Sequence, residues 1–155
     1  MAHITPCLWF DGKAEEAAHF YVSLLANSSV NHVTRAPGDY PMGKAGDVLT
    51  VEFTLLGRPF VGLNGGSAFK FTEAVSFQLP VDTQAEIDRL SNALSAVPDA
   101  EQCGWVKDQY GLSWQIFPRR LTELLADKDV AKAKRVFDAM MQMKRINLAE
   151  IEAAA

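Results

Sequence analysis

The sequence has little cysteine and no long apolar run. Its two cysteines, Cys7 and Cys103, lie far apart and form no Cys-x-x-Cys pattern, which excludes a zinc knuckle and a dithiol redox site. No segment approaches the roughly 20 apolar residues that span a bilayer. The N-terminus also lacks the basic stretch and apolar run of a signal peptide. We therefore expect a cytoplasmic protein with reduced thiols and no membrane partner.

The sequence also has no excess of basic residues. The net charge is -4 and the pI is about 5.3, which gives no electrostatic reason to expect nucleic acid as a partner. Basic residues do gather between Arg119 and Arg145, but acidic residues are interleaved with them, as on a solvated helix face. With 48% apolar residues in 155, the chain is long and apolar enough for one ordered globular domain, predicted over residues 1–155.

What is present is a repeated order of strands and helices. Alternating apolar residues predict strands at 4–10, 30–35, 48–56 and 59–63, and helical spacing predicts a helix at 13–25. A shorter version follows, with strands at 74–81, 103–107 and 112–117 and a helix at 84–96 that Asp82 and Thr83 can cap. This duplication predicts an α+β domain with module one at about 3–66 and module two at about 72–118.

A helical segment is expected after Pro118, over about 119–155. Leu121, Leu124 and Leu125 predict a short helix, and a second helix begins at Asp129 and carries a methionine-rich face. Packing within the core or between subunits is the simpler interpretation of that face. A binding surface for another protein is the alternative.

Several ordered motifs resemble the PhnB-like family of the vicinal oxygen chelate superfamily, which includes glyoxalase I and the bleomycin-resistance proteins. The motifs are Ile4-Thr5-Pro6-Cys7-Leu8-Trp9-Phe10, Phe20-Tyr21, Leu63-Asn64-Gly65-Gly66, the stretch 69–77, Gln102-Cys103-Gly104-Trp105, Tyr110-Gly111-Leu112-Ser113-Trp114-Gln115-Ile116 and Ala139-Met140-Met141-Gln142-Met143-Lys144. The resemblance implies the glyoxalase/bleomycin resistance fold, with two βαβββ modules around a cleft, and a homodimer. Some members are described as 3-demethylubiquinone methyltransferases.

Metal-dependent relatives place four His or Glu ligands on the cleft-facing positions of the first and last strand of each module. Carried over by strand parity, these positions are Thr5, Gly62 (or Asn64 if the register slips), Ser76 and Gln115. None is a good ligand for a divalent ion, and His3, His19 and His32 lie elsewhere. We therefore predict no metal and no other cofactor. No glycine-rich loop follows the first strand to hold S-adenosylmethionine.

The predicted ligand cleft combines aromatic surface with a few polar groups, which suits a small, partly apolar ligand. Its residues are Thr5, Cys7, Trp9, Glu52, Gly62, Asn64, Ser76, Gln78, Ser113 and Gln115. Glu52 is the one candidate general base, provided that the cleft buries it, but a rim carboxylate on the solvent side of the hairpin is the simpler interpretation. Cys7 is expected to be a buried structural thiol. The leading hypothesis is a metal-independent, dimeric small-molecule binding protein. The alternatives are a lyase or isomerase that recruits a metal through Glu52 and a histidine, or the family's methyltransferase.

Overall fold

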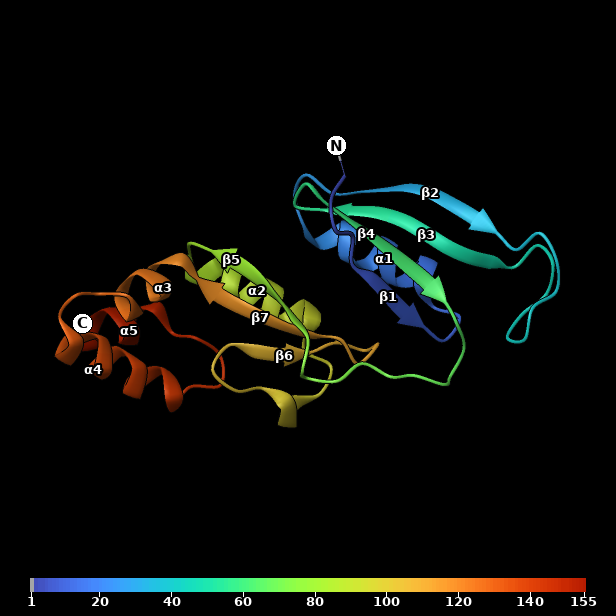
Figure 1. Ribbon diagram of the computed structural model, residues 1–155. Helices are drawn as coiled ribbons and strands as arrows, with labels where there is room; N and C mark the ends of the chain where they lie inside the picture. Colours follow the sequence, from blue (N-terminus) through green and yellow to red (C-terminus); the bar gives the residue numbers. More distant parts are fainter. Residues whose placement is uncertain (1) are drawn as a thin grey trace. The chain divides into compact units, whose positions relative to one another are not determined.

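A computed structural model describes residues 2–155 and divides the chain into two compact units (Figure 1). Unit 1 extends to Phe71 and unit 2 is Thr72–Ala155. This boundary falls between the two modules predicted from the sequence. The single domain over the whole chain stays a prediction. Each unit is described by itself.

Unit 1 is a four-stranded sheet with one helix against it. The elements are β1 (Cys7–Phe10), α1 (Ala14–Leu24), β2 (Ser29–Arg35), β3 (Val48–Leu55) and β4 (Arg58–Asn64). The strand order is β1-β4-β3-β2, with β1 parallel to β4 and the other pairs antiparallel. Leu56 and Gly57 join β3 to β4 with positive φ angles at both residues, the backbone that a tight two-residue hairpin requires.

The core of unit 1 lies between α1 and one face of this sheet. Strand residues such as Leu8, Val51 and Phe53 are buried there against Ala14 and Tyr21 of the helix. Small side chains let the helix approach closely, since a Cβ placed on Gly62 would lie 3.2 Å from the Cβ of Ala14. The alanine-rich stripe seen in the sequence is therefore the buried face of α1.

Unit 2 repeats this order with one strand fewer. Its sheet has β5 (Ser76–Val81), β7 (Ser113–Pro118) and β6 (Trp105–Lys107) in the order β5-β7-β6, and β5 is again parallel to β7. Helix α2 (Gln84–Leu94) buries Ile87, Leu90 and Leu94. A single 3-10 turn (Pro98–Ala100) stands where unit 1 has β2. The duplication predicted from the sequence is confirmed, including the shorter second copy.

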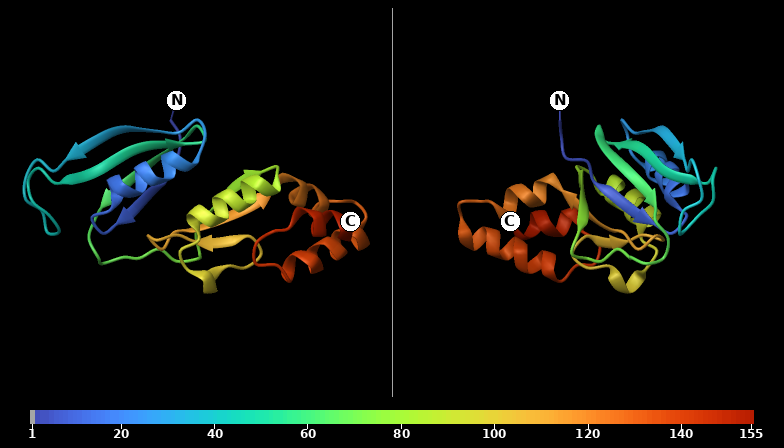
Figure 2. Two further views of the ribbon diagram at one scale, coloured as in Figure 1. Left: turned by 180° about the vertical axis from the view of Figure 1, so that it is seen from behind. Right: turned by 45° about the vertical axis from the view of Figure 1, so that its right-hand side comes forward.

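Three helices complete unit 2: α3 (Arg119–Leu125), α4 (Val130–Met141) and α5 (Leu148–Ala154) (Figure 2). The amides of Cys103 and Gly104 donate to the carbonyls of Met143 and Lys144, which ties the segment to the loop before β6. Ile146 and Ile151 are fully buried. The C-terminal segment is therefore part of the core of unit 2. Among residues 2–155, no helix is both long and apolar enough to cross a membrane.

Candidate functional site

Each sheet has one face under its helix and a second face that carries polar side chains. In unit 2, the parallel pairing of β5 with β7 sets Ser76 beside Ser113 and Gln78 beside Gln115. These four residues alternate with the buried Leu79, Trp114 and Ile116, so they share the face turned away from α2. The sequence pattern predicts that all four share one face, and the strand register confirms it, but Ser113 is only 1% exposed and so is not open to a ligand.

Gln115 is the centre of a small hydrogen-bond network on this polar face. Its amide nitrogen donates to Ser76 Oγ at 2.8 Å, and its amide oxygen accepts from Gln78 Nε2 at 3.4 Å. Ser76 Oγ accepts in this bond, which leaves its own proton available to a ligand. Gln78 is exposed, whereas Gln115 is half-buried. The network therefore presents neutral donors and acceptors with a fixed orientation at its centre.

The third strand extends this face with residues that the sequence analysis did not assign to the site. Lys107 on β6 is paired with Ser113, and Trp105 is paired with Gln115. Lys107 forms an ion pair with Glu73, and the hydrogen bond and charge of Lys107 hold the pKa of the Glu73 carboxyl below its ordinary value. Sequence parity within the strand could have found Trp105 and Lys107, since both have opposite parity to the buried Val106.

In unit 1, the equivalent face carries Cys7, Glu52 and His32 in one row across the sheet. Cys7 is paired with Val61, Val61 with Glu52, and Glu52 with His32. Because neighbouring strands are about 4.8 Å apart, Cys7 and Glu52 are separated by roughly 10 Å. Glu52 and His32 are direct cross-strand neighbours. The row brings a carboxylate and an imidazole to one exposed surface.

One expectation for this face is wrong, and the burial that a second one required is not found. Cys7 is exposed and not a buried structural thiol, because its side chain lies on the sheet face opposite the buried Leu8 and Phe10. Partial desolvation still raises the pKa of the Cys7 thiol, which lowers its thiolate fraction at neutral pH. Glu52 is also exposed and so lacks the burial on which its role as a general base depended. Thr5 is half-buried and immediately precedes Pro6 and β1.

Gly62 and Asn64 do not lie on the polar face of unit 1, which corrects their assignment to the cleft. The register pairs Gly62 with Leu8 and Asn64 with Phe10, and both partners are buried toward α1. The Asn64 side chain accepts from the amide of Ala14 at 2.9 Å and donates to the carbonyl of Val48 at 2.9 Å. Asn64 therefore caps the start of α1 and anchors the start of β3, which is a structural role.

Trp9 lies on the predicted face of β1, opposite the buried Leu8 and Phe10, but local contacts occupy much of its side chain. Its indole nitrogen donates to the carbonyl of Gly66 at 2.8 Å, and its ring makes an edge contact with Phe69. A Cβ on Gly65 would lie only 2.3 Å from the ring, so the glycine is needed for this packing. Trp9 thus holds the segment after β4 against the sheet.

The donor set at the four family positions does not fit a divalent metal. Gly62 has no side chain, both ends of the Asn64 amide are engaged, and Ser76 and Gln115 bind each other. Over residues 2–155, no cluster of three or more His, Cys, Asp or Glu side chains is placed to hold a metal ion. The pair Glu52 and His32 supplies two donors, fewer than the ligand sets of ordinary protein metal sites.

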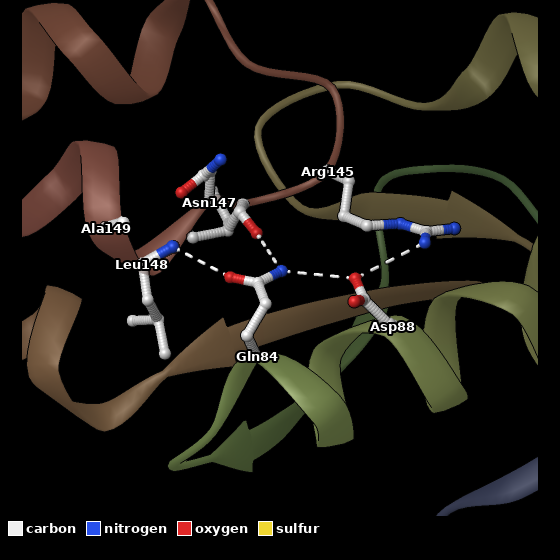
Figure 3. A pocket seen from close by; sticks show the side chains of 7 residues that line it. Gln84, Asp88, Arg145, Asn147, Leu148 and Ala149 are labelled. Atoms are coloured by element: carbon white, nitrogen blue, oxygen red, sulfur yellow. Dashed lines mark hydrogen bonds and ion pairs between the residues drawn. The ribbon is translucent and has the colours of Figure 1, made fainter.

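Unit 2 also has an open pocket of about 620 Å³ between α2 and the start of α5 (Figure 3). At its centre, Gln84 Nε2 donates to Asp88 Oδ1 and to the carbonyl of Ile146, each at 3.1 Å, while Gln84 Oε1 accepts from the amide of Leu148. Arg145 contacts Asp88 in turn. The polar wall of this pocket is thus a set of mutual bonds that joins α2 to α5. This pocket could not be predicted from the sequence, since one glutamine at the start of a helix has no diagnostic pattern.

Residues 2–117 match the sequence model of the family described as 3-demethylubiquinone-9 3-methyltransferase. Among solved structures, the chain resembles a PhnB protein from Bacillus cereus with the same methyltransferase description, at 35% identity and a TM-score of 0.64, over 76% of this chain and 99% of that chain. Protein PA1353 from Pseudomonas aeruginosa has a similar fold, at 20% identity and a TM-score of 0.58, over 76% and 98% of the two chains. A search of curated proteins found no match.

Proposed function

The chain belongs to the PhnB-like family described as 3-demethylubiquinone-9 3-methyltransferase and has the glyoxalase/bleomycin resistance fold; from this premise we propose that it binds a small, partly apolar molecule without a metal ion. The ligand would lie on the polar face of β5 and β7. The observation that carries this proposal is the hydrogen-bond network of Gln115 with Ser76 and Gln78. Two members of this network, Ser76 and Gln115, stand at the positions where metal-dependent relatives have their metal ligands.

The chemistry of this face favours a neutral ligand. An amide and a hydroxyl can donate to a carbonyl or phenol oxygen and accept from a hydroxyl, but they do not stabilise a full charge well. Trp105 and Phe117 lie on the same face of the sheet and supply aromatic surface for an apolar ring. A planar, oxygen-bearing ring satisfies both requirements. A phenol or quinone is therefore the ligand class that this surface suits.

A direct test uses a short-chain 3-demethylubiquinone analogue as the probe, since the family description contains that compound class. We expect the probe to raise the melting temperature of the wild-type protein equally with and without a chelator. Gln115→Leu should weaken binding by about tenfold, because it removes both side-chain bonds of the central amide at nearly constant volume. Isothermal titration calorimetry gives the two dissociation constants.

Gln109→Leu is the matched control, because Gln109 is exposed on the turn before β7 and outside the network. It should bind the probe as the wild type does. Equal affinity of Gln115→Leu and wild type would overturn the site. Binding that disappears with the chelator would overturn metal independence, and elemental analysis of the loaded protein would then identify the ion.

The methyltransferase of the family description is a second candidate, favoured by the match over residues 2–117. It requires S-adenosylmethionine, yet the turn after β1 is short and the first amide of α1 is already bonded by Asn64. This helix start therefore does not fit the cofactor's carboxylate or ribose. Calorimetric titration with S-adenosylmethionine separates the candidates. Saturable binding followed by methyl transfer to the probe would favour the enzyme.

A further inference from the structure

Lys107 is the only charged residue in the three strands of unit 2, all of which the structure describes. It has opposite parity to the buried Val106, so its side chain lies on the polar face that holds the proposed ligand site. The other residues of this face carry hydroxyl, amide or apolar side chains. A face whose other groups suit a neutral ligand therefore contains one full positive charge.

This charge is close enough to act on a ligand beside Gln115. Lys107 is paired with Ser113, and Gln115 follows two residues later on the same strand. Such diagonal neighbours in an antiparallel pair are about 7–8 Å apart, within reach of a long side chain. The carbonyl of Lys107 accepts from the amide of Ala96 at 2.9 Å, so the backbone is anchored and only the side chain has to move. An unpaired ammonium here would attract an anionic ligand.

Glu73, in the turn before β5, takes up this charge by forming an ion pair with Lys107. Because β7 lies between β5 and β6, the pair joins the two outer parts of the sheet across the start of β7. Ser113 stands at that start and is only 1% exposed. The space left for a ligand on this face is therefore beside the ion pair, toward Gln115.

The two charges balance each other at neutral pH. The hydrogen bond and the charge of Lys107 hold the pKa of the Glu73 carboxyl below its ordinary 4.5, so Glu73 remains ionised. The Lys107 side chain is 26% exposed and that of Glu73 is 59% exposed. Lys107 is thus the inner member of the pair and Glu73 the outer one. A ligand at Gln115 meets a neutral pair instead of a free cation.

We propose that Glu73 is a specificity-determining residue of the ligand site: it neutralises Lys107 and thereby sets a preference for an uncharged ring over an anionic one. This inference rests on the proposed function, because it concerns a ligand held at Gln115. An anionic ligand has to compete with the Glu73 carboxylate for the ammonium and is repelled by that carboxylate. A neutral ligand leaves the ion pair intact.

Two probes with the same ring test the preference. Methyl 4-hydroxybenzoate is neutral at neutral pH, whereas the carboxyl group of 4-hydroxybenzoate is ionised. Isothermal titration calorimetry of the full chain gives both dissociation constants, and we expect the wild type to bind the ester more tightly than the acid. In Glu73→Gln, the ratio of the acid's constant to the ester's should fall about fivefold, because the freed ammonium of Lys107 attracts the carboxylate.

Lys107→Met should change the same ratio in the opposite direction. It leaves the Glu73 carboxylate without its partner, so the acid is repelled and the ratio should rise about fivefold. A chain with both substitutions carries neither charge, and its ratio should lie within about twofold of the wild-type value. Opposite shifts that cancel are expected from charge and not from the loss of a structural contact.

Asp99→Asn is the matched control, because Asp99 is an exposed carboxylate of unit 2 outside the strands. It should keep the wild-type ratio. An unchanged ratio in Glu73→Gln and Lys107→Met, with the ester still bound, would overturn the role of Glu73 and leave the proposed function standing. Tighter binding of the acid than of the ester by the wild type would do the same.

Melting curves of the variants identify a purely structural ion pair. If Glu73→Gln and Lys107→Met both melt at lower temperature while the ratio stays constant, the pair only ties the turn before β5 to β6, and the specificity role is refuted. If the wild type binds neither probe, the aromatic ligand class of the proposed function fails, and this inference fails with it.

Discussion

At the scale of single residues, Asn64 shows how a polar side chain at an expected ligand position can have another task. Its amide oxygen satisfies one of the backbone N–H groups that a helix start leaves without an intrahelical partner. Its amide nitrogen reaches the carbonyl of Val48 at the start of β3. The side chain is only 8% exposed, so neither bond is easily replaced by water.

Replacing Asn64 by alanine should lower the free energy of unfolding by about 1–2 kcal/mol, since the cap of α1 and a second buried bond are lost. Hydrogen exchange of the peptide that contains α1 should show faster opening. Asn31→Ala is the comparison, because Asn31 is exposed and makes its bond to Thr54 at the surface. If both variants unfolded with the same free energy as the wild type, the capping role of Asn64 would be refuted.

At the scale of elements, α2 begins with a reciprocal capping box. Thr83 accepts from the backbone amide of Glu86, and the Glu86 carboxylate accepts in turn from the amide of Thr83. It also accepts from the amide of Asp82 at 3.0 Å. These backbone bonds, that of Asp82 above all, lower the pKa of Glu86 from its ordinary 4.5. The ionised form is therefore the form that the folded protein prefers.

Glu86→Gln should consequently destabilise the protein in a pH-dependent way. A carboxyl group with a lower pKa in the folded state contributes stability above its unfolded pKa, and this is lost as pH falls through the folded pKa. The difference from wild type should be largest at neutral pH and shrink below pH 4.5. Urea unfolding at several pH values measures it. Asp99→Asn, which changes an exposed carboxylate outside α2, should show no such trend.

The elements also show what the sequence could predict of the site. In β7, polar and apolar residues alternate, and Gln115 and Ser113 fell on the correct face because Trp114 and Ile116 fix the buried one. In β4, Phe60 alternates with Val61 and Leu63, so both faces are apolar and alternation cannot identify the buried one. The error at Gly62 and Asn64 follows from this. The buried face of β4 follows only from its pairing with β1, and a local sequence pattern does not encode that pairing.

At the scale of the whole molecule, the C-terminal helices belong to the core of unit 2. Leu121, Leu124, Val136, Ile146 and Ile151 are almost fully buried although they follow the last strand. Each such side chain is worth about 1.5–3 kcal/mol of burial. Their sum is comparable to the whole stability of an ordinary domain.

A chain that ends at Arg120 should therefore fail to form unit 2. We expect amides of β5, β6 and β7 to exchange within seconds, as in an unfolded segment. A chain that ends at Glu152, which lacks only the last three alanines, should retain slow exchange in these strands. Slow exchange in the shorter chain would instead mean that the helices are an addition to a self-sufficient sheet.

The parallel pairing of the first and last strand in each unit bears on synthesis at the ribosome. β1 can find its place only after β4 has been made, and β5 only after β7. Because translation proceeds from the N-terminus, unit 1 can close before the strands of unit 2 emerge. The nascent β5 must then wait, with its apolar Leu79 and Val81 uncovered, until β7 and the C-terminal helices follow. The apolar Leu8 and Phe10 of β1 wait for β4 in the same way, so each half of the chain carries one strand that stays uncovered until the last strand of its sheet is made.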